Sequence, residues 1–330
     1  MPKTTIVALL VAARSLAAVA QLPLPAPPAG LDQPAPLTPE RRAAFEAAMK
    51  AQDYKRAETL LVEAINANPN SPQLLVLAAG VFFLDGDYMN TAIAYKKAEK
   101  LAPLDDRSRF TLAMAYVALD RREWARPELE TLAAANPKAA LYPYWLARLD
   151  YDEQKFAAAV EKLNLAVSLQ PDFVKAHDNL GLNLEALGKF EEAQRAYGEA
   201  VRLNRALKPR SPWPPLNLGV MLLKLGKLDL AEPHLREALE LDPKFAEARY
   251  RLGILLEKKG KAPEAILELA RAAELDATYP DPPYALARLY RQAGEMEKAQ
   301  AALAEFQKRK SWKRPAQTTK SSLPRRARPE

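Results

Sequence analysis

The sequence predicts an all-α protein in which two-helix units stack in a row and form a solenoid. In one stretch, residues 177–204, apolar residues recur every three or four positions on both sides of Gly188, which is the spacing of two short amphipathic helices joined by a turn. Counterparts of this stretch recur along most of the chain, and no residue type suggests a sheet. Because neither helix of a pair could bury its apolar stripe alone, each pair must pack on its neighbours.

The repeat length follows from the prolines. A proline recurs at one constant interval, at Pro69, Pro103, Pro137 and Pro171. The next proline in phase, Pro243, lies four positions further from Pro171 than two such intervals would place it, so one repeat is longer than the others. The irregular segment at residues 208–211 is the predicted insertion.

Small residues keep the same period, as expected where two helix backbones pass closely. One position in the second helix of each unit holds Ala57, Thr91, Ala125, Ala159, Ala193, Ala231, Ala265 and Ala299. A position in the first helix holds Ala79, Ala113, Ala147, Gly181, Gly219, Gly253 and Ala287. Glycines between the two helices provide backbone freedom at Gly86, Gly188, Gly226, Gly260 and Gly294. We therefore predict eight units, starting near Thr38, Pro72, Asp106, Ala140, Val174, Pro212, Ala246 and Pro280.

This pattern resembles the tetratricopeptide repeat (TPR), a 34-residue helix–turn–helix unit, over residues 38–307. The resemblance implies a right-handed superhelical solenoid of paired antiparallel helices whose first helices line a concave groove for a protein or peptide. Carried over by register, the groove candidates are Phe110, Tyr144, Arg148, Tyr151, Asn179, Trp213, Asn217, Tyr250, Arg251, Tyr284 and Arg288; Phe83, Met114 and Glu257 share this register. Each aromatic residue in this set could instead pack between repeats, and both uses stay open.

Two details refine the expected groove. Some TPR domains grip a peptide backbone or a C-terminal carboxylate with polar residues at the register of Asn179, Asn217 and Arg251. The carboxylate clamp also needs a lysine and a second asparagine, but Asp178 and Leu182 occupy those places, so we do not expect that clamp. An asparagine-based grip on a peptide backbone stays open. Trp213 adjoins the insertion, where solenoids often present a binding loop, although it could merely cap the groove beside it.

Positive charge is concentrated at the end of the chain. The net charge is +7, and residues 308–330 contain nine basic residues and one acid. We expect this tail to be disordered, and either to attract an anionic polymer or membrane surface or to act as a solubilising extension. The candidate residues are Lys308, Arg309, Lys310, Lys313, Arg314, Arg325, Arg326 and Arg328.

The chain begins with a segment that resembles an export signal. Residues 1–20 combine Lys3, an apolar run from Ile6 to Ala13 and a small-residue cleavage site ending at Ala20, although Arg14 interrupts the pattern. We expect a periplasmic or secreted protein; the alternatives are an organelle transit peptide and an uncleaved cytoplasmic start. Residues 21–37 are rich in proline and predict an extended linker.

No constellation of residues indicates catalysis. The chain has no cysteine, and its two histidines, His177 and His234, have no neighbouring ligands in metal-site spacing. We expect no enzyme activity, no cofactor and no metal. The predicted function is a noncatalytic scaffold or adaptor that binds a protein or peptide in the concave groove, with cell-envelope assembly or secretion as the setting. The alternative is a polyanion or anionic-membrane-surface binder that acts through the basic tail.

Overall fold

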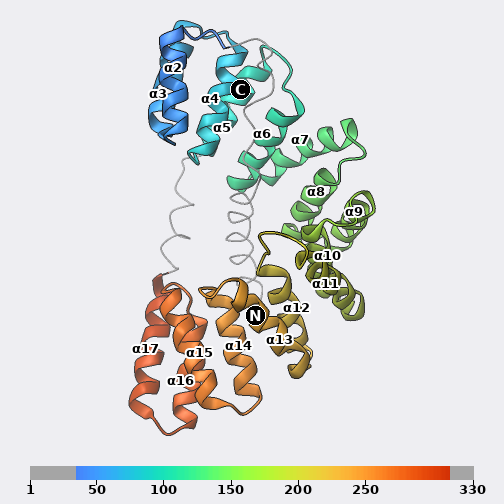
Figure 1. Ribbon diagram of the computed structural model, residues 1–330, viewed down its shortest axis with the longest axis vertical. Coiled ribbons are helices and arrows are strands. Elements are labelled where there is room, and N and C mark those ends of the chain that lie inside the picture. Colours follow the sequence, from blue (N-terminus) through green and yellow to red (C-terminus); the bar gives the residue numbers. More distant parts are fainter. Residues whose placement is uncertain (1–34, 313–330) are drawn as a thin grey trace, which may run out of the picture. The chain divides into compact units, whose positions relative to one another are not determined.

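The computed structural model describes residues 35–312, and all regular structure in this range is α-helical (Figure 1). The chain divides into two compact units, residues 1–171 and 172–330. The predicted signal at residues 1–20, most of the linker, and the tail from residue 313 onward lie outside the described residues.

Each unit contains four helix pairs in chain order. Those of the first unit are α2 (Pro39–Lys50) with α3 (Tyr54–Ala67), α4 (Pro72–Leu84) with α5 (Tyr88–Glu99), α6 (Asp106–Ala118) with α7 (Arg122–Ala135), and α8 (Leu141–Asp152) with α9 (Phe156–Leu169). Those of the second unit are α10 (Val174–Ala186) with α11 (Phe190–Asn204), α12 (Trp213–Lys224) with α13 (Leu228–Leu241), α14 (Ala246–Lys258) with α15 (Ala262–Leu275), and α16 (Asp281–Gln292) with α17 (Met296–Trp312). Every predicted repeat start falls at or next to the start of a first helix, so the prediction of eight units is confirmed.

Close helix packing explains the period of small residues. The second-helix residues from Ala57 to Ala265 at that position are fully buried, and Ala299 in the last repeat is nearly so. On the first helices, a Cβ atom added to Gly253 would lie 2.7 Å from Leu269 Cγ, and one added to Gly219 would lie 2.9 Å from Leu235. Only a hydrogen fits between these helices, so the register of small residues fixes how each pair packs.

The predicted insertion is a loop between α11 and α12 that is tied to the end of α11. The fully buried Asn204 makes two bonds across it: its Nδ2 donates to the Ser211 carbonyl at 2.8 Å, and its Oδ1 accepts from the Ser211 N–H at 2.9 Å. The side-chain amide of Asn204 thus provides hydrogen-bond partners for backbone groups of a loop that has no regular secondary structure. The extra residues therefore leave the flanking repeats intact.

Two predicted boundaries need correction. Ala35, assigned to the linker, is buried on the first repeat, and its carbonyl accepts from Arg42 Nη2 at 2.9 Å. At the other end, α17 continues to Trp312, past the boundary predicted at residue 307. The predicted tail residues Lys308 and Lys310 are therefore helical and exposed, whereas Arg309 is buried.

Candidate functional site

The first helices of the second unit form a continuous surface. Each of α10, α12 and α14 contacts the next first helix as well as its own pair. Polar bonds join the first two: Asn217 Nδ2 donates to both oxygens of Asp178 at 2.8 and 2.9 Å, and Lys224 Nζ pairs with Glu185 at 2.6 Å. The polar side chains between α10 and α12 therefore bond to one another across the interface of the two helices.

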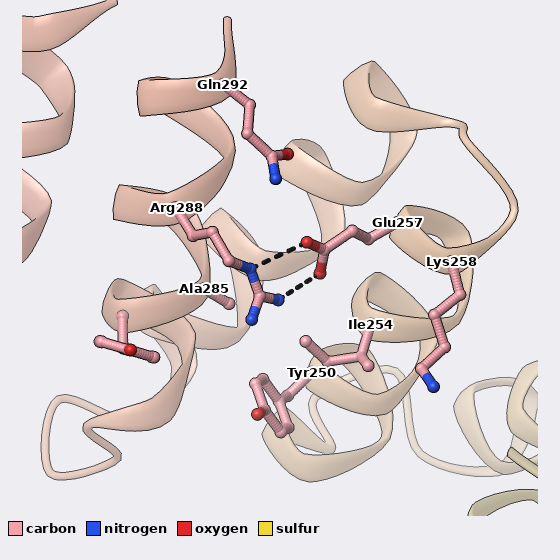
Figure 2. A pocket seen from close by; sticks show the side chains of 8 residues that line it. Tyr250, Ile254, Glu257, Lys258, Ala285, Arg288 and Gln292 are labelled. Atoms are coloured by element: carbon pink, nitrogen blue, oxygen red, sulfur yellow. Dashed lines mark hydrogen bonds and ion pairs between the residues drawn. The ribbon is translucent and has the colours of Figure 1, made fainter. Parts of the chain in front are cut away.

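A hollow opens between the next two first helices, α14 and α16 (Figure 2). Its volume is about 570 Å³, within the range of about 300–1,000 Å³ that is usual for ligand sites. All of its lining residues come from these two helices: Tyr250, Ile254, Glu257, Lys258, Tyr284, Ala285, Arg288 and Gln292. We call it the α14–α16 hollow.

The hollow lies where α16 carries shorter side chains than its counterpart α12. Ala285 stands two repeat lengths after Asn217 in the sequence, and Gln292 stands two repeat lengths after Lys224. Asn217 and Lys224 reach back to the preceding first helix, but the methyl group of Ala285 cannot reach α14. Space therefore remains beside Tyr250.

Aromatic rings form two sides of the hollow. The Tyr250 ring packs edge-on against Tyr279 at a centroid distance of 5.2 Å, and the Arg251 guanidinium lies 5.3 Å from the Tyr250 centroid. Burial raises the pKa of the Tyr250 hydroxyl above its ordinary value of 10.0, because the charged form loses solvation. Tyr284, which also lines the hollow, is 52% exposed and contacts Phe306. One ring is held in place and the other is available for contact.

The charged residues of the hollow leave an excess of positive charge. Arg288 donates from Nε to Glu257 Oε1 at 2.9 Å and from Nη2 to Oε2 at 2.5 Å, as Figure 2 shows. This bidentate pair neutralises the one carboxylate of the lining. Lys258 adds a further positive charge, and its side chain is exposed.

Arg309 fixes the wall of the hollow from behind. Its Nη1 donates to the carbonyl oxygens of Ala273, Asp276 and Tyr279 at 3.0, 3.0 and 3.2 Å. Tyr279 is the residue against which Tyr250 packs. The last carbonyl groups of a helix have no donor within that helix, and Arg309 supplies one to the end of α15 and the following loop. Arg309, predicted to bind a polyanion, thus fastens α17 to the loop that supports the hollow.

Three of the first-unit candidates gather around Trp145: Phe110, Tyr144 and Arg148. Tyr144 is 3% exposed and packs against Trp145, and Phe110 lies 6.4 Å from the same indole. Arg148 stacks over Trp145 at 4.7 Å, while Tyr151 packs on Phe156 at 5.6 Å. For Tyr144 the structure favours packing within the fold over contact with a ligand.

The remaining second-unit candidates have partners within the protein. Asn179 Nδ2 donates to the Lys175 carbonyl at 2.8 Å, and Asn217 bonds Asp178 as described. Arg251 contacts Glu247 at 3.3 Å, and Trp213 packs edge-on against Phe245 at 4.7 Å. Of the residues in the predicted groove register, the structure brings four together in one hollow: Tyr250, Glu257, Tyr284 and Arg288.

Four lining residues are absent from the sequence-based set: Ile254, Lys258, Ala285 and Gln292. The sequence contains one indication of the hollow: Ala285 is small at a register where the preceding repeats carry the larger Asn217 and Arg251. Ala285 lines the hollow through its small size, and a pattern of large or polar residues does not indicate such a position.

Metal-binding clusters and membrane-spanning helices are both absent from residues 35–312. Within this range, no group of three or more His, Cys, Asp or Glu residues is placed to hold a metal ion. No helix of the same range is both long and apolar enough to cross a bilayer.

Comparisons with known proteins give relatives for more than half of the chain. It is 25% identical over 201 residues to anaphase-promoting complex subunit 3 of Schizosaccharomyces pombe, which covers 58% of this chain and 29% of that protein. It is 26% identical over 200 residues to the TPR repeat-containing protein YpiA of Bacillus subtilis, covering 59% of this chain and 45% of that one. The chain thus spans less than half the length of either relative.

A solved structure supports the fold. A tetratricopeptide repeat protein from Parabacteroides merdae aligns with a TM-score of 0.61, covering 76% of this chain and 97% of that one at 18% identity. Tetratricopeptide repeat family models match residues 42–106, 110–172 and 216–281, and a second such model matches residues 172–244. With eight two-helix repeats and family matches over most of its length, the chain belongs to the tetratricopeptide repeat family.

Proposed function

We propose that this protein is a noncatalytic scaffold that holds a segment of a partner protein along the first helices of its second unit. The observation that carries the proposal is the α14–α16 hollow, which is lined by first-helix residues alone. It combines an exposed tyrosine, an aliphatic residue and charged groups at its rim, which is the composition of a site that anchors one or two side chains of a peptide.

The comparisons support an interaction role of this kind. TPR proteins typically act as scaffolds, and two curated relatives are named as members of assemblies: anaphase-promoting complex subunit 3, and mouse BBSome complex member BBS4 at 26% identity over 161 residues. By analogy, this chain would act by joining other proteins.

Site-specific photo-crosslinking in the full chain tests the proposal. A photoreactive phenylalanine analogue replaces Gln292 at the rim of the hollow, and the matched control carries it at Gln300, an exposed glutamine on the second helix α17. We expect a discrete crosslinked partner from position 292 and none from position 300. The Tyr284→Ala change should abolish the crosslink, whereas Phe190→Ala, which removes an exposed ring from α11, should leave it unchanged. Equal labelling at both positions would contradict the proposal.

The same experiment addresses the alternative that the basic tail binds a polyanion. Of the predicted tail residues, Arg309 is engaged in the fold, so the variant that removes the tail should end at Trp312 and not at Gln307. Partner capture that requires residues 313–330 and disappears in high salt would favour the tail, because contacts between exposed charges are screened.

We further propose that residues 1–20 direct export, placing the scaffold in the cell envelope or outside the cell. The sequence of the segment supports this proposal. Fusing these residues to a reporter that is active only after export tests it, with Ile6–Ala13 interrupted by two lysines as the control. A reporter that stays inactive with the intact segment would argue for the cytoplasmic alternative.

A further inference from the structure

The α14–α16 hollow combines an apolar seat with a positively charged rim. We call the apolar part of its lining the seat; it consists of Ile254, Ala285 and the rings of Tyr250 and Tyr284. Tyr250 is fixed by its packing on Tyr279, so this side of the seat is preorganised. A bulky apolar side chain placed there would bury its surface against aromatic and aliphatic groups and lose little free energy to rearrangement.

The rim has unequal capacity for the two signs of charge. Both oxygens of Glu257 already accept hydrogen bonds from Arg288, so this carboxylate offers little to a cationic ligand. These bonds engage Nε and Nη2 of Arg288, whose side chain is still 46% exposed. Lys258 stands exposed beside the same seat. Because Lys258 extends away from the Arg288–Glu257 pair (Figure 2), a carboxylate at the rim would meet one of the two cations and no unpaired acid.

From these observations we propose that the α14–α16 hollow binds an acidic segment of a partner protein, with a large apolar side chain in the seat and a neighbouring Asp or Glu carboxylate at Lys258. This proposal rests on the proposed function and specifies its ligand. A basic segment would bring its charge to Lys258 at an energetic cost, and a small free anion would leave the aromatic walls unused.

Selection from a random peptide library tests the chemistry of the ligand. Peptides displayed on phage are selected on the immobilised full chain, and the recovered sequences are synthesised with both ends blocked, so that only side-chain carboxylates can contribute. We expect the recovered peptides to pair an aromatic or large aliphatic residue with an adjacent Asp or Glu. Neutral or basic consensus sequences that still require Tyr284 would overturn the inference.

Charge reversal gives the quantitative test on the best selected peptide. Lys258→Glu should weaken its binding by about tenfold or more, since it replaces attraction at the rim with repulsion. The matched control is Lys244→Glu, which changes the net charge equally at an exposed lysine in the loop before α14, away from the hollow. We expect the control to change the affinity by less than about twofold. Equal effects of the two variants would show that only the net charge matters and would contradict the proposal.

The outcomes separate the ligand inference from the proposed function. If peptide binding depends on Tyr284 but not on Lys258 or on an acidic residue of the peptide, the proposed scaffold function is supported and the proposed acidic ligand is contradicted. Failure to select any peptide, together with no crosslink from position 292, would count against both. The circular dichroism spectrum of each variant should match that of the wild type, because Lys258 and Tyr284 are exposed and their replacement leaves the helix core untouched.

Discussion

Single residues decide how each repeat turns between its two helices. All eight turns of the described repeats contain a residue with positive φ, between 56° and 79°. Five are glycines, and the other three are Gln52, Asp120 and Gln154. A Cβ atom at any of the five glycines would meet no neighbouring atom within 4 Å, so the backbone conformation, not space, selects glycine there.

This geometry predicts opposite effects for glycine substitutions of the same kind. Gly226→Ala should lower the free energy of unfolding by about 1 kcal/mol, because an L-residue at positive φ is strained. Gly198→Ala, within α11 and with open space at the Cβ position, should raise it by about 0.5–1 kcal/mol. Urea unfolding of the two variants gives the comparison. The same sign for both would contradict the assignment of strain to the turn. By the same argument, Gln154→Gly should be stabilising.

A buried phenol makes the stability of the fold sensitive to alkaline pH. Burial raises the pKa of Tyr95 from 10.0 to about 12 in the folded protein. Between these values the unfolded chain has lost the proton and the folded chain keeps it, so the unfolded state binds fewer protons and stability falls as pH rises. Two pKa units at about 1.4 kcal/mol each give a loss of about 2–3 kcal/mol by pH 12.

Tyr95→Phe removes this titration. The variant should lose less stability than the wild type between pH 10 and pH 12, although other buried tyrosines keep some slope in both proteins. Guanidinium unfolding across this pH range measures the difference between the two slopes. Parallel slopes would mean that Tyr95 does not carry the effect.

Among the elements, α17 does more than close the last repeat. Its final turn carries Arg309, which joins the end of α15 and the loop before α16 through three carbonyl oxygens. Glu305 on the same helix accepts from Arg309 Nε at 2.7 Å and orients the guanidinium. The last helix therefore holds together the loop on which Tyr250 rests.

The α17 contact predicts a shared loss of stability and binding. Arg309→Met should lower the stability of the second unit by about 1–3 kcal/mol, because three carbonyl groups lose their donor. Hydrogen exchange should increase around Tyr279, and a peptide bound in the α14–α16 hollow should bind more weakly. The control Lys308→Met removes the same charge from a neighbour whose side chain is 76% exposed. If both variants are as stable as the wild type, the hydrogen bonds of Arg309 do not contribute to the stability of the second unit.

For the whole molecule, the organisation is a chain of nearest-neighbour contacts within each unit. Helix pairs contact the pairs before and after them, and first helices contact successive first helices. Stability in such a chain is the sum of repeat and interface contributions, so a local defect lowers local stability most. The residues of the α14–α16 hollow all belong to the last two repeats.

A core defect in the first unit should therefore leave the hollow functional. Leu112, fully buried on α6, lies in the first unit, and Leu112→Ala should cost about 2–4 kcal/mol there. Hydrogen exchange should rise in α4 to α7, while the affinity of a peptide selected on the hollow should stay within about twofold. The matched change Leu255→Ala on α14 should lower the stability of the second unit and also weaken peptide binding to the hollow. A large loss of affinity from Leu112→Ala would show coupling across the whole chain.

The sequence by itself determined the all-α class, the eight repeats with their starts, the small residues at helix crossings and the inserted loop. These features are periodic, and each follows from local spacing and side-chain volume. It also indicated four lining residues of the hollow through their register on the first helices: Tyr250, Glu257, Tyr284 and Arg288.

Only the tertiary structure decided where the hollow opens and which charges remain at its rim. Asn217 is occupied by Asp178, Glu257 by Arg288, and Arg309 turns inward to carbonyl groups instead of extending into a basic tail. These outcomes depend on which side chains of neighbouring repeats, far apart in the sequence, reach one another across the interface. Spacing places two residues on facing helices, but side-chain length and competing partners decide whether they meet.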